Sequence, residues 1–421
     1  MELSKAVPQG YKLTDAGVIP KDWALIPLRN LASEISDGIH STPSYVHQSD
    51  YHFVNGNNLV NGKIHITEKT NCVSEVEYHQ LKKPLTPQSI LLSINGTIGN
   101  IAFFNNETVV LGKSAAYINL KKDVSKEFIS FTLASQRVSQ YFENELTGTT
   151  IRNLSLESLK NTPIAIPLEV DEQKAIAAAL SDVDALLAQL DALITKKRDL
   201  KQAAMQQLLT AQTRLPGFSG EWPLEKIDSF TSFITKGSTP TTYGFEWQNS
   251  GVLFLRSECV SENGLDLTQS KYISNDAHQT LIRGEVRAGD ILMTITGNVG
   301  RVVLLSSKFE VANINQHVAR IRINKPTVSP AYLYHWLSQP RIRKDFNTIT
   351  TGQAYPQISL KQVRDALVPL PSISEQITIA RILSDMDAEI TALEARRDKT
   401  RALKQGMMQE LLTGKTRLIQ N

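Results

Sequence analysis

The longest regular pattern of apolar and polar positions in this chain is helical, and it occurs twice. Residues 172–210 and 375–413 align with about half of their positions identical. Apolar residues recur three and four positions apart in both copies, which is typical of a helix that packs against a partner helix. Neither copy contains Pro and the only Gly is Gly406, so each copy predicts one helix of roughly 60 Å. The predicted helix-pair seam consists of Ile176, Leu180, Val183, Leu187, Leu190, Ile194, Ile379, Ile382, Met386, Ile390 and Leu393.

The sign of the charge changes halfway along each of these helices. The first copy has Asp182 and Asp184 early and Lys197 and Lys201 late, and the second copy repeats this order. A parallel pair would place acid beside acid, whereas an antiparallel pair places acid beside base along its length. The pattern therefore predicts an antiparallel pair. The alternative, two solvated helix faces in unrelated places, is disfavoured because both the seam and the charge blocks are duplicated.

The repeat also includes the segments that precede each helix. Residues 36–43 correspond to 235–240, residues 90–99 to 291–300, and residues 147–156 to 351–360. Short β-branched runs at 90–94, 101–104, 291–295 and 302–305 predict strands, and residues 128–142 and 332–346 each predict one helix. Ser372 with Glu375 fits a capping box, and Gly414 suits a C-terminal cap.

These elements predict an α+β protein. We expect two mixed α/β globular domains in tandem repeat, separated by two long α-helices that pair as an antiparallel coiled coil. The predicted boundaries are 1–168 for the first domain with its N-terminal lead-in and 169–213 for the central helix. The second domain is predicted at 214–371, and the C-terminal helix and tail at 372–421.

Composition adds little to this picture. The 421 residues carry a formal net charge of +3, which is only a mild preference for a polyanion. Cys72 and Cys259 lie far apart with no CxxC or Cys/His cluster, so we expect neither a disulfide framework nor a metal site. No apolar run has the length of a membrane span, and the N-terminal residues lack a signal-peptide core, so a cytoplasmic protein with no membrane partner is expected.

Sequence signatures of catalysis are weak. The pairs Gly96/Gly99 and Gly297/Gly300 are GxxG, which favours tight turns over a dinucleotide fingerprint, and residues 414–416 lack the upstream glycine of a phosphate-binding loop. There is no HExxH motif, no adenine-methyltransferase Asn-Pro-Pro-Tyr motif and no convincing nuclease carboxylate cluster. We therefore predict no catalytic residues and no metal ligands in this chain.

Two ordered sets of short motifs run along the chain. They are Gly17-Val18-Ile19-Pro20 with Trp23; Gly289-Asp290-Ile291-Leu292 followed by Gly297 and Gly300; Gly148-Thr149-Thr150 with Leu154-Ser155-Leu156; Ile164-Ala165-Ile166-Pro167 and Leu367-Val368-Pro369-Leu370-Pro371; and the helices that open with Glu-Gln. Each motif is weak alone, but two ordered sets at this spacing are specific. Their order resembles the specificity (S, HsdS) subunit of Type I restriction-modification systems over essentially the whole chain. Departures are small: Gln88-Ser89 stands where the second domain has Gly289-Asp290, and residues 353–356 lack the Thr-Thr pair of the first domain.

The resemblance implies a non-catalytic subunit that binds double-stranded DNA. Each domain would read one half of a bipartite asymmetric site, and the helices would set the spacer and dock two modification (HsdM) subunits. It also implies restriction (HsdR) subunits that join the methyltransferase complex. This chain would bind no cofactor itself, because S-adenosylmethionine, ATP and Mg²⁺ are expected in the partner subunits.

The DNA-contact candidates are polar residues of the loops in which the two domains differ. Arg, Asn and Gln can bond base edges in pairs, although such residues also occur in the variable loops of any duplicated fold. In the first domain the candidates are His40, Ser41, Thr42, Asn55, Asn57, Lys113, Ser114, Thr150 and Arg152. In the second they are Lys236, Ser238, Thr239, Arg256, Gln316, His317, Gln353 and Tyr355.

Two other functions stay open on the sequence. A scaffold or adaptor could use the helical rod to bind proteins without sequence-specific DNA contact. A fragment of a restriction enzyme would instead have its own active site.

Overall fold

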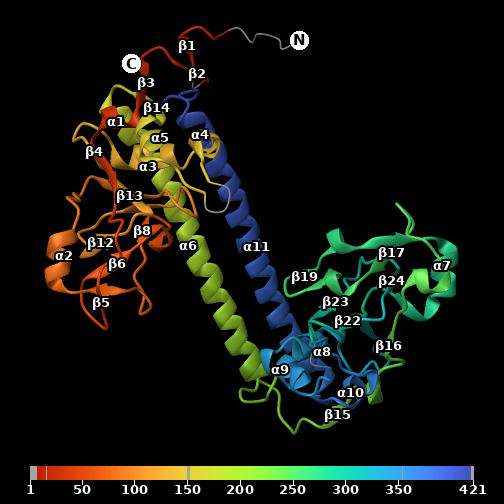
Figure 1. The fold of residues 1–421 in the computed structure, drawn as a ribbon. Helices are drawn as coiled ribbons and strands as arrows, with labels where there is room; N and C mark the ends of the chain where they lie inside the picture. Colours follow the sequence, from red (N-terminus) through yellow and green to blue (C-terminus); the bar gives the residue numbers. More distant parts are fainter. Residues whose placement is uncertain (1–6, 16, 149–151, 353, 419–421) are drawn as a thin grey trace. The chain divides into compact units, whose positions relative to one another are not determined.

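The computed structural model describes residues 7–15, 17–148, 152–352 and 354–418, and contacts divide the chain into two compact units. Unit 1 comprises residues Met1–Leu190 with Arg396–Asn421, and unit 2 comprises Asp191–Ala395. Each unit holds one globular part and one half of each long helix, α6 (Val170–Leu208) and α11 (Ile373–Leu411) (Figure 1). The predicted fold class, two mixed α/β domains with two long helices, is confirmed.

Unit 1 is built on two four-stranded sheets. The first has the order β11-β10-β13-β4, and the second has the order β12-β6-β9-β5, in which β12 and β6 are parallel. The strands of these sheets are β4 (Ala32–Asp37), β5 (Tyr45–Val46), β6 (His52–Val54), β9 (Cys72–Val73), β10 (Ser89–Ser93), β11 (Ile101–Phe103), β12 (Val109–Leu111) and β13 (Ala115–Leu120). Three further antiparallel pairs are β1 (Tyr11–Thr14) with β2 (Gly17–Pro20), β3 (Trp23–Pro27) with β14 (Pro163–Pro167), and β7 (Leu59–Val60) with β8 (Lys63–Ile64). The shorter helices are α1 (Leu28–Leu31), α2 (Glu75–Leu81), α3 (Lys126–Leu133), α4 (Gln136–Glu145) and α5 (Leu156–Asn161).

Unit 2 repeats this plan. Its four-stranded sheets have the orders β16-β25-β22-β23 and β20-β17-β24-β21, and β17 and β24 are parallel. Their strands are β16 (Thr235–Lys236), β17 (Val252–Leu255), β20 (Lys271–Ile273), β21 (Glu285–Val286), β22 (Ile291–Thr294), β23 (Val302–Leu304), β24 (Ala312–Ile314) and β25 (Val318–Ile321). Two further pairs are β15 (Leu224–Lys226) with β26 (Leu367–Pro369), and β18 (Val260–Ser261) with β19 (Gly264–Leu265). The shorter helices are α7 (Asn275–Thr280), α8 (Pro330–Leu337), α9 (Pro340–Thr348) and α10 (Leu360–Asp365).

The central strand of each unit is buried on both faces. In unit 1, Ile90 and Leu92 of β10 belong to the core under the helices, while Leu91 faces the core shared with the second sheet. In unit 2, Ile291 of β22 joins the helix-side core and Leu292 joins the sheet-side core. Alternate residues of a strand point to opposite faces, so a strand covered on both sides is a continuous apolar run. This explains why 90–94 and 291–295 are apolar at almost every position, and both pair with the following predicted strand as antiparallel neighbours.

The two single helices predicted at 128–142 and 332–346 are wrong, because each is a pair of helices. In unit 1 the break falls at Ser135, whose side chain accepts a hydrogen bond from Val138 N and so caps α4. In unit 2 Pro340 opens α9 as its first residue. Proline is tolerated at a helix start but not inside a helix, where it removes a hydrogen bond and clashes with the preceding turn. Pro340 was a sequence signal for this break.

The long helices pair antiparallel within each unit, as the charge pattern predicted. In unit 1 the first half of α6 lies beside the last half of α11 (Figure 1), and Lys404 pairs with Asp184 at 2.6 Å. In unit 2, Lys197 pairs with Glu389 at 2.6 Å and Lys201 with Asp387 at 2.5 Å, so residue numbers rise along one helix as they fall along the other. Among the seam residues, Ile176, Leu180, Leu190, Ile194, Ile379 and Ile390 are buried, and Val183, Leu187, Ile382, Met386 and Leu393 are half-buried.

The ends of the seam lie in globular cores. Ile176 and Leu180 share a core cluster with the strands of unit 1, and Ile379 does the same in unit 2. The apolar stripe therefore anchors each helix start to its own globular part as well as pairing the two helices.

Equivalent buried contacts hold the start of each long helix. Gln173 Oε1 accepts from Ser125 N in unit 1, and Gln376 Oε1 accepts from Ser329 N in unit 2, both at 2.9 Å. At the start of α11, Ser372 Oγ accepts from Glu375 N, as a capping box requires. The Glu375 carboxylate is instead bound by Arg214, at 2.8 Å from Nε and 2.8 Å from Nη2.

Among the described residues, no helix is both long enough and apolar enough to cross a membrane.

Candidate nucleic-acid interface

In unit 2, four of the predicted DNA-contact residues form one connected cluster. The Thr239 hydroxyl donates to Gln316 Oε1 at 2.6 Å, and Gln316 Nε2 lies 3.0 Å from His317 Nε2. The His317 ring meets the Tyr355 ring edge-on, with 6.2 Å between the centroids. Tyr355 is 61% exposed. The cluster thus combines an amide with an exposed aromatic ring, which are groups that read bases by hydrogen bonding and by stacking.

Backbone hydrogen bonds from three segments hold this cluster. Gly237 N donates to Asn315 O at 3.1 Å, Ile295 N to His317 O at 2.9 Å, and Gly297 N to Pro356 O at 2.8 Å. A methyl group on Gly237 would lie 1.6 Å from a carbonyl oxygen at the end of β24, so only glycine allows this close approach. The frame therefore does not depend on which side chains stand at 239, 316 and 355.

The other candidates of unit 2 lie outside the cluster. The Arg256 guanidinium donates from Nε and Nη2 to Gln269 O at 3.3 and 3.1 Å, so it braces the loop that carries it. Lys236 is exposed on β16, and Ser238 is half-buried. Gln353 lies outside the described residues.

In unit 1, Ser114 stands where unit 2 has His317, and Asn55 stands where unit 2 has Arg256. Ser114 Oγ donates to Asn55 Oδ1 at 2.9 Å and accepts from Gly56 N at 2.9 Å, and both side chains are half-buried. Their side chains hold the turn together. Lys113 beside them is exposed, and its carbonyl oxygen accepts from Asn95 Nδ2 at 3.2 Å.

The remaining candidates of unit 1 are exposed polar residues. His40 Nε2 lies 2.9 Å from Asp37 Oδ2, and Arg152 Nη1 lies 2.9 Å from Glu143 Oε2. Ser41, Thr42 and Asn57 are also exposed. Within the described part of the chain, no hydrogen bond or ion pair joins the side chains of these five residues to the Asn55–Ser114 pair. Thr150 lies outside the described residues.

Glu258 was missed by the sequence analysis. It takes the place in unit 2 that Asn57 takes in unit 1, and it is exposed. Partial burial raises its pKa, but hydrogen bonds from backbone and Ser257 together with the charges of Arg256 and His317 outweigh burial and hold the pKa below its ordinary value. An ionised carboxylate therefore stands close to the cluster. The repeat was the available signal, because Asn57 had been selected at the equivalent position.

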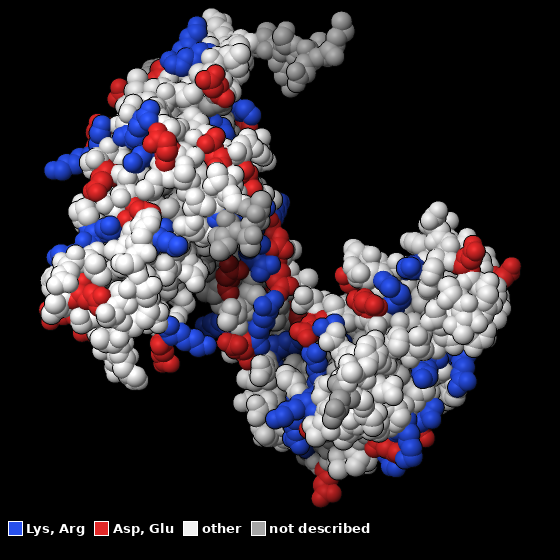
Figure 2. Space-filling model, viewed as in Figure 1, with Lys and Arg blue, Asp and Glu red and all other residues white. Residues whose placement is uncertain are grey.

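On the face that Figure 2 shows, positive and negative side chains are mixed. Lys and Arg side chains are interspersed there with Asp and Glu. This agrees with the net charge of +3. Phosphate neutralisation by this chain alone would therefore be modest.

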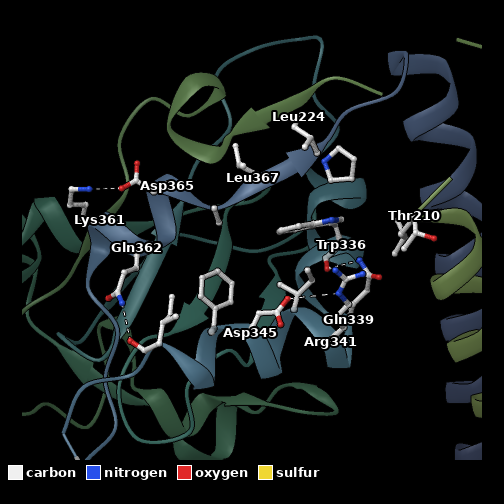
Figure 3. A pocket seen from close by; sticks show the side chains of 16 residues that line it. Thr210, Leu224, Trp336, Gln339, Arg341, Asp345, Lys361, Gln362, Asp365 and Leu367 are labelled. Carbon is white, nitrogen blue, oxygen red and sulfur yellow. Dashed lines mark hydrogen bonds and ion pairs between the residues drawn. The ribbon is translucent and has the colours of Figure 1, made fainter. Parts of the chain in front are cut away.

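A groove of about 690 Å³ in unit 2 has a different chemistry (Figure 3). Trp336, Phe346 and Leu367 contribute apolar walls, and the ion pair of Lys361 with Asp365 lies at its rim. Asp345 of this groove corresponds to Tyr141 in unit 1. The Tyr141 hydroxyl donates to Ser158 O at 3.0 Å and so joins α4 to α5. The groove thus joins apolar walls to polar side chains that include Arg341 and Gln362.

Comparisons with known proteins agree with the repeat. Residues 20–197 and 221–401 each match the Type I restriction modification DNA specificity domain. The chain is 24% identical over 347 residues to the Type I restriction enzyme EcoBI specificity subunit of Escherichia coli, covering 77% of this chain and 72% of that protein. It is 23% identical over 427 residues to the putative Type I restriction enzyme MjaX specificity subunit of Methanocaldococcus jannaschii, covering 97% of each.

A solved structure shares the fold. The S subunit of a Type I restriction-modification system from M. genitalium superposes with a TM-score of 0.59 at 16% identity, covering 95% of this chain and 97% of that one. Since the two domain matches together span most of the sequence, this chain belongs to the Type I restriction-modification DNA specificity family.

Proposed function

We propose that this chain is the non-catalytic specificity subunit of a Type I restriction-modification complex. Each globular part reads one half of a bipartite, asymmetric DNA site. The paired helices fix the length of the unspecified spacer and dock two methyltransferase subunits, which supply adenine methylation. Restriction subunits join through that complex.

One observation carries this proposal: the two units share a backbone frame but differ in the side chains that it presents. Ile94 N donates to Ser114 O in unit 1, and Ile295 N donates to His317 O in unit 2, both at 2.9 Å. The side chains around these bonds differ in charge and hydrogen-bonding capacity. A duplicated frame with divergent polar loops suits the reading of two different half-sites.

The main experiment maps methylated bases in DNA from cells that express this chain with its methyltransferase. We expect two different half-sites separated by a spacer of fixed length. Replacing residues 214–371 with the equivalent domain of another family member should change one half-site and leave the other unchanged. A chain acting as an adaptor without DNA contact would leave the methylated sequences unchanged.

The spacer role has its own test. Inserting four residues after Leu190 in α6 and four after Ala395 in α11 lengthens both helices by one turn, roughly 6 Å. The tolerated spacer should then grow by about two base pairs, given 3.4 Å per base pair. A change in the half-site sequences instead would contradict the proposed role of the helices.

The partner role is tested by binding. Because the net charge is small, the isolated chain should bind DNA weakly, and adding methyltransferase should restore tight, site-specific binding. Equal sequence specificity with and without the partner would contradict this.

A further inference from the structure

Lys113 and Gln316 occupy the same position in the two units. Each stands in the turn after the strand that pairs in parallel, β12 in unit 1 and β24 in unit 2, and before the next strand of the repeat. The preceding residues make matching bonds: Gly112 N donates to Val54 O at 2.9 Å, and Asn315 N donates to Leu255 O at 3.1 Å. The backbone is therefore equivalent at 113 and 316 while the side chains differ in kind.

Half of the hydrogen-bonding capacity of the Gln316 amide is used inside unit 2. Its oxygen accepts from the Thr239 hydroxyl, and its nitrogen lies within hydrogen-bond distance of His317 Nε2. An amide has two N–H donors and two oxygen lone pairs. Among the residues that the structure describes, one donor and one acceptor therefore remain without a partner. Exchanging the amide nitrogen and oxygen leaves the same pair, because the Thr hydroxyl and the imidazole can each act as donor or acceptor.

The groups that orient the amide are themselves held in place. Thr239 precedes Pro240, which is buried and opens a short 3-10 helix. The His317 ring is packed against Tyr355, and His317 N donates to Asn315 Oδ1 at 3.1 Å. Holding the amide before DNA binds reduces the entropy lost on binding. Thr239 and His317 are therefore positioning residues for Gln316.

The remaining donor and acceptor of Gln316 match one base. In the major groove, adenine presents the N7 acceptor beside the N6 donor, and Gln pairs with both at once. Guanine presents two adjacent acceptors, N7 and O6, which suit a group that only donates. The exposed ammonium group of Lys113 is such a group.

We propose that positions 113 and 316 each determine one base, with Gln316 reading adenine in the half-site of unit 2 and Lys113 reading guanine in the half-site of unit 1. This rests on the proposed function, because it requires that each unit reads DNA. Beyond that function, it names the residue that reads a base in each unit, the base that it reads, and the two residues that orient the Gln316 amide.

A reciprocal exchange tests the inference in the purified complex with the methyltransferase, using duplexes in which both half-sites are randomised. Gln316→Lys should change one position of the unit 2 half-site from adenine to guanine, and Lys113→Gln should make the opposite change in the unit 1 half-site. The expected change in preference is on the order of 5- to 150-fold at that position, with the other half-site unaffected. Unchanged thermal unfolding and unchanged affinity for unrelated duplexes would show that the variants are folded.

The positioning role has a separate readout. Thr239→Val removes the hydroxyl and keeps the shape, so it should weaken the preference for adenine at that single position, whereas Thr239→Ser should keep it. Affinity for DNA that lacks the site should not change in either variant. An equal effect of both substitutions would refute this role.

Two outcomes separate this inference from the proposed function. If Gln316→Lys lowers affinity for all sequences equally, or leaves the preferred base unchanged, residue 316 does not read a base while the chain still specifies a site. If the unmodified complex selects no sequence at all, the proposed function itself fails.

Discussion

Arg417 makes the contact that ties the C-terminal segment to the start of α6 in unit 1, and its loss should destabilise that unit. Its guanidinium bonds Glu172 at 2.5 and 2.8 Å and Asp22 at 3.0 and 2.6 Å. The Glu172 side chain is 4% exposed, so Arg417→Met leaves a buried carboxylate without its cation. Removing one partner of a buried pair costs about 3–5 kcal/mol. Asp22 is half-exposed, so its share adds less than about 1 kcal/mol.

The assay must report each unit separately, because a protein with two compact units need not unfold in one step. Hydrogen exchange of peptides from each unit, followed in increasing urea, meets this need. Arg417→Met should lower the free energy of unfolding of unit 1 by about 3–5 kcal/mol. The control is Arg401→Met, because Arg401 forms an exposed pair with Asp398 on α11, and its loss should cost under about 1 kcal/mol.

Two further variants complete the test. Arg214→Met should destabilise unit 2 in the same way, because Arg214 binds Glu375, whose side chain is 2% exposed. The double variant Arg417→Met with Glu172→Met should recover most of the loss, because it removes the uncompensated charge. If Arg417→Met and Arg401→Met have equal effects, or if the loss from Arg417→Met appears equally in unit 2, the reasoning is refuted.

The same contact predicts a dependence on pH. The hydrogen bond from Arg417 holds the pKa of Asp22 below its ordinary value of 3.8. Stability from this contact is therefore present above the unfolded-state pKa and is lost as the pH falls through the lower folded-state pKa. In the Arg417→Met variant, unit 1 should not show this loss of stability when the pH is lowered and unfolding is followed by hydrogen exchange.

The same exchange assay checks the remaining predictions. Gly406→Ala should stabilise α11 by about 0.5–1 kcal/mol, because the added methyl group meets nothing within 4 Å. Gly237→Ala should instead destabilise unit 2, because its methyl group would lie 1.6 Å from Ile314 O. Effects of the same sign in the two variants would contradict this. Burial lowers the pKa of His335 to about 4, so the unfolded state binds a proton more readily than the folded state. Unit 2 should therefore lose stability as the pH falls from about 6.5 to about 4. His335→Gln should remove this dependence of stability on pH, and an unchanged dependence would contradict the role given to His335. Gln376→Leu leaves Ser329 N and Pro371 O without the partner that Gln376 supplies, and both contacts are buried. Unit 2 should therefore lose about 1–3 kcal/mol of unfolding free energy for each of these two groups, and hydrogen exchange unchanged from the parent protein would contradict this.

The regular elements could be predicted because their patterns are local. Charge blocks such as Lys197 with Glu389 predicted the antiparallel pairing, since the sign of the charge changes halfway along both helices. The apolar runs at 90–94 and 291–295 likewise predicted strands, because a strand buried on both faces is apolar at successive positions. The single helix across 332–346 was an avoidable error, because Pro340 marks a helix start.

The side chains of the candidate interface could be predicted less well, because their directions depend on distant contacts. Asn55 was selected for its amide, yet that amide accepts from Ser114, which lies far along the chain. Arg256 was selected for its guanidinium, which bonds the carbonyl oxygen of Gln269. Only tertiary structure decides whether a polar loop residue turns inward or toward solvent. Thr239 and Gln316 were both selected, but the hydrogen bond between them could not have been inferred from sequence.

If each unit reads DNA as proposed, stability and recognition rest on different residues in each unit. The turns at 113 and 316 are held by backbone hydrogen bonds and by close glycine contacts such as Gly38 against Leu111 O, so their backbone does not depend on the side chains of Lys113, which is exposed, and Gln316, which is half-buried. An exposed substitution usually changes stability by less than about 0.5 kcal/mol, whereas a new donor and acceptor pattern changes base preference by about 1–3 kcal/mol. Each unit also has its own hydrophobic cores. Under the proposed function, a change of one half-site would therefore require neither a new frame nor an adjustment of the other unit.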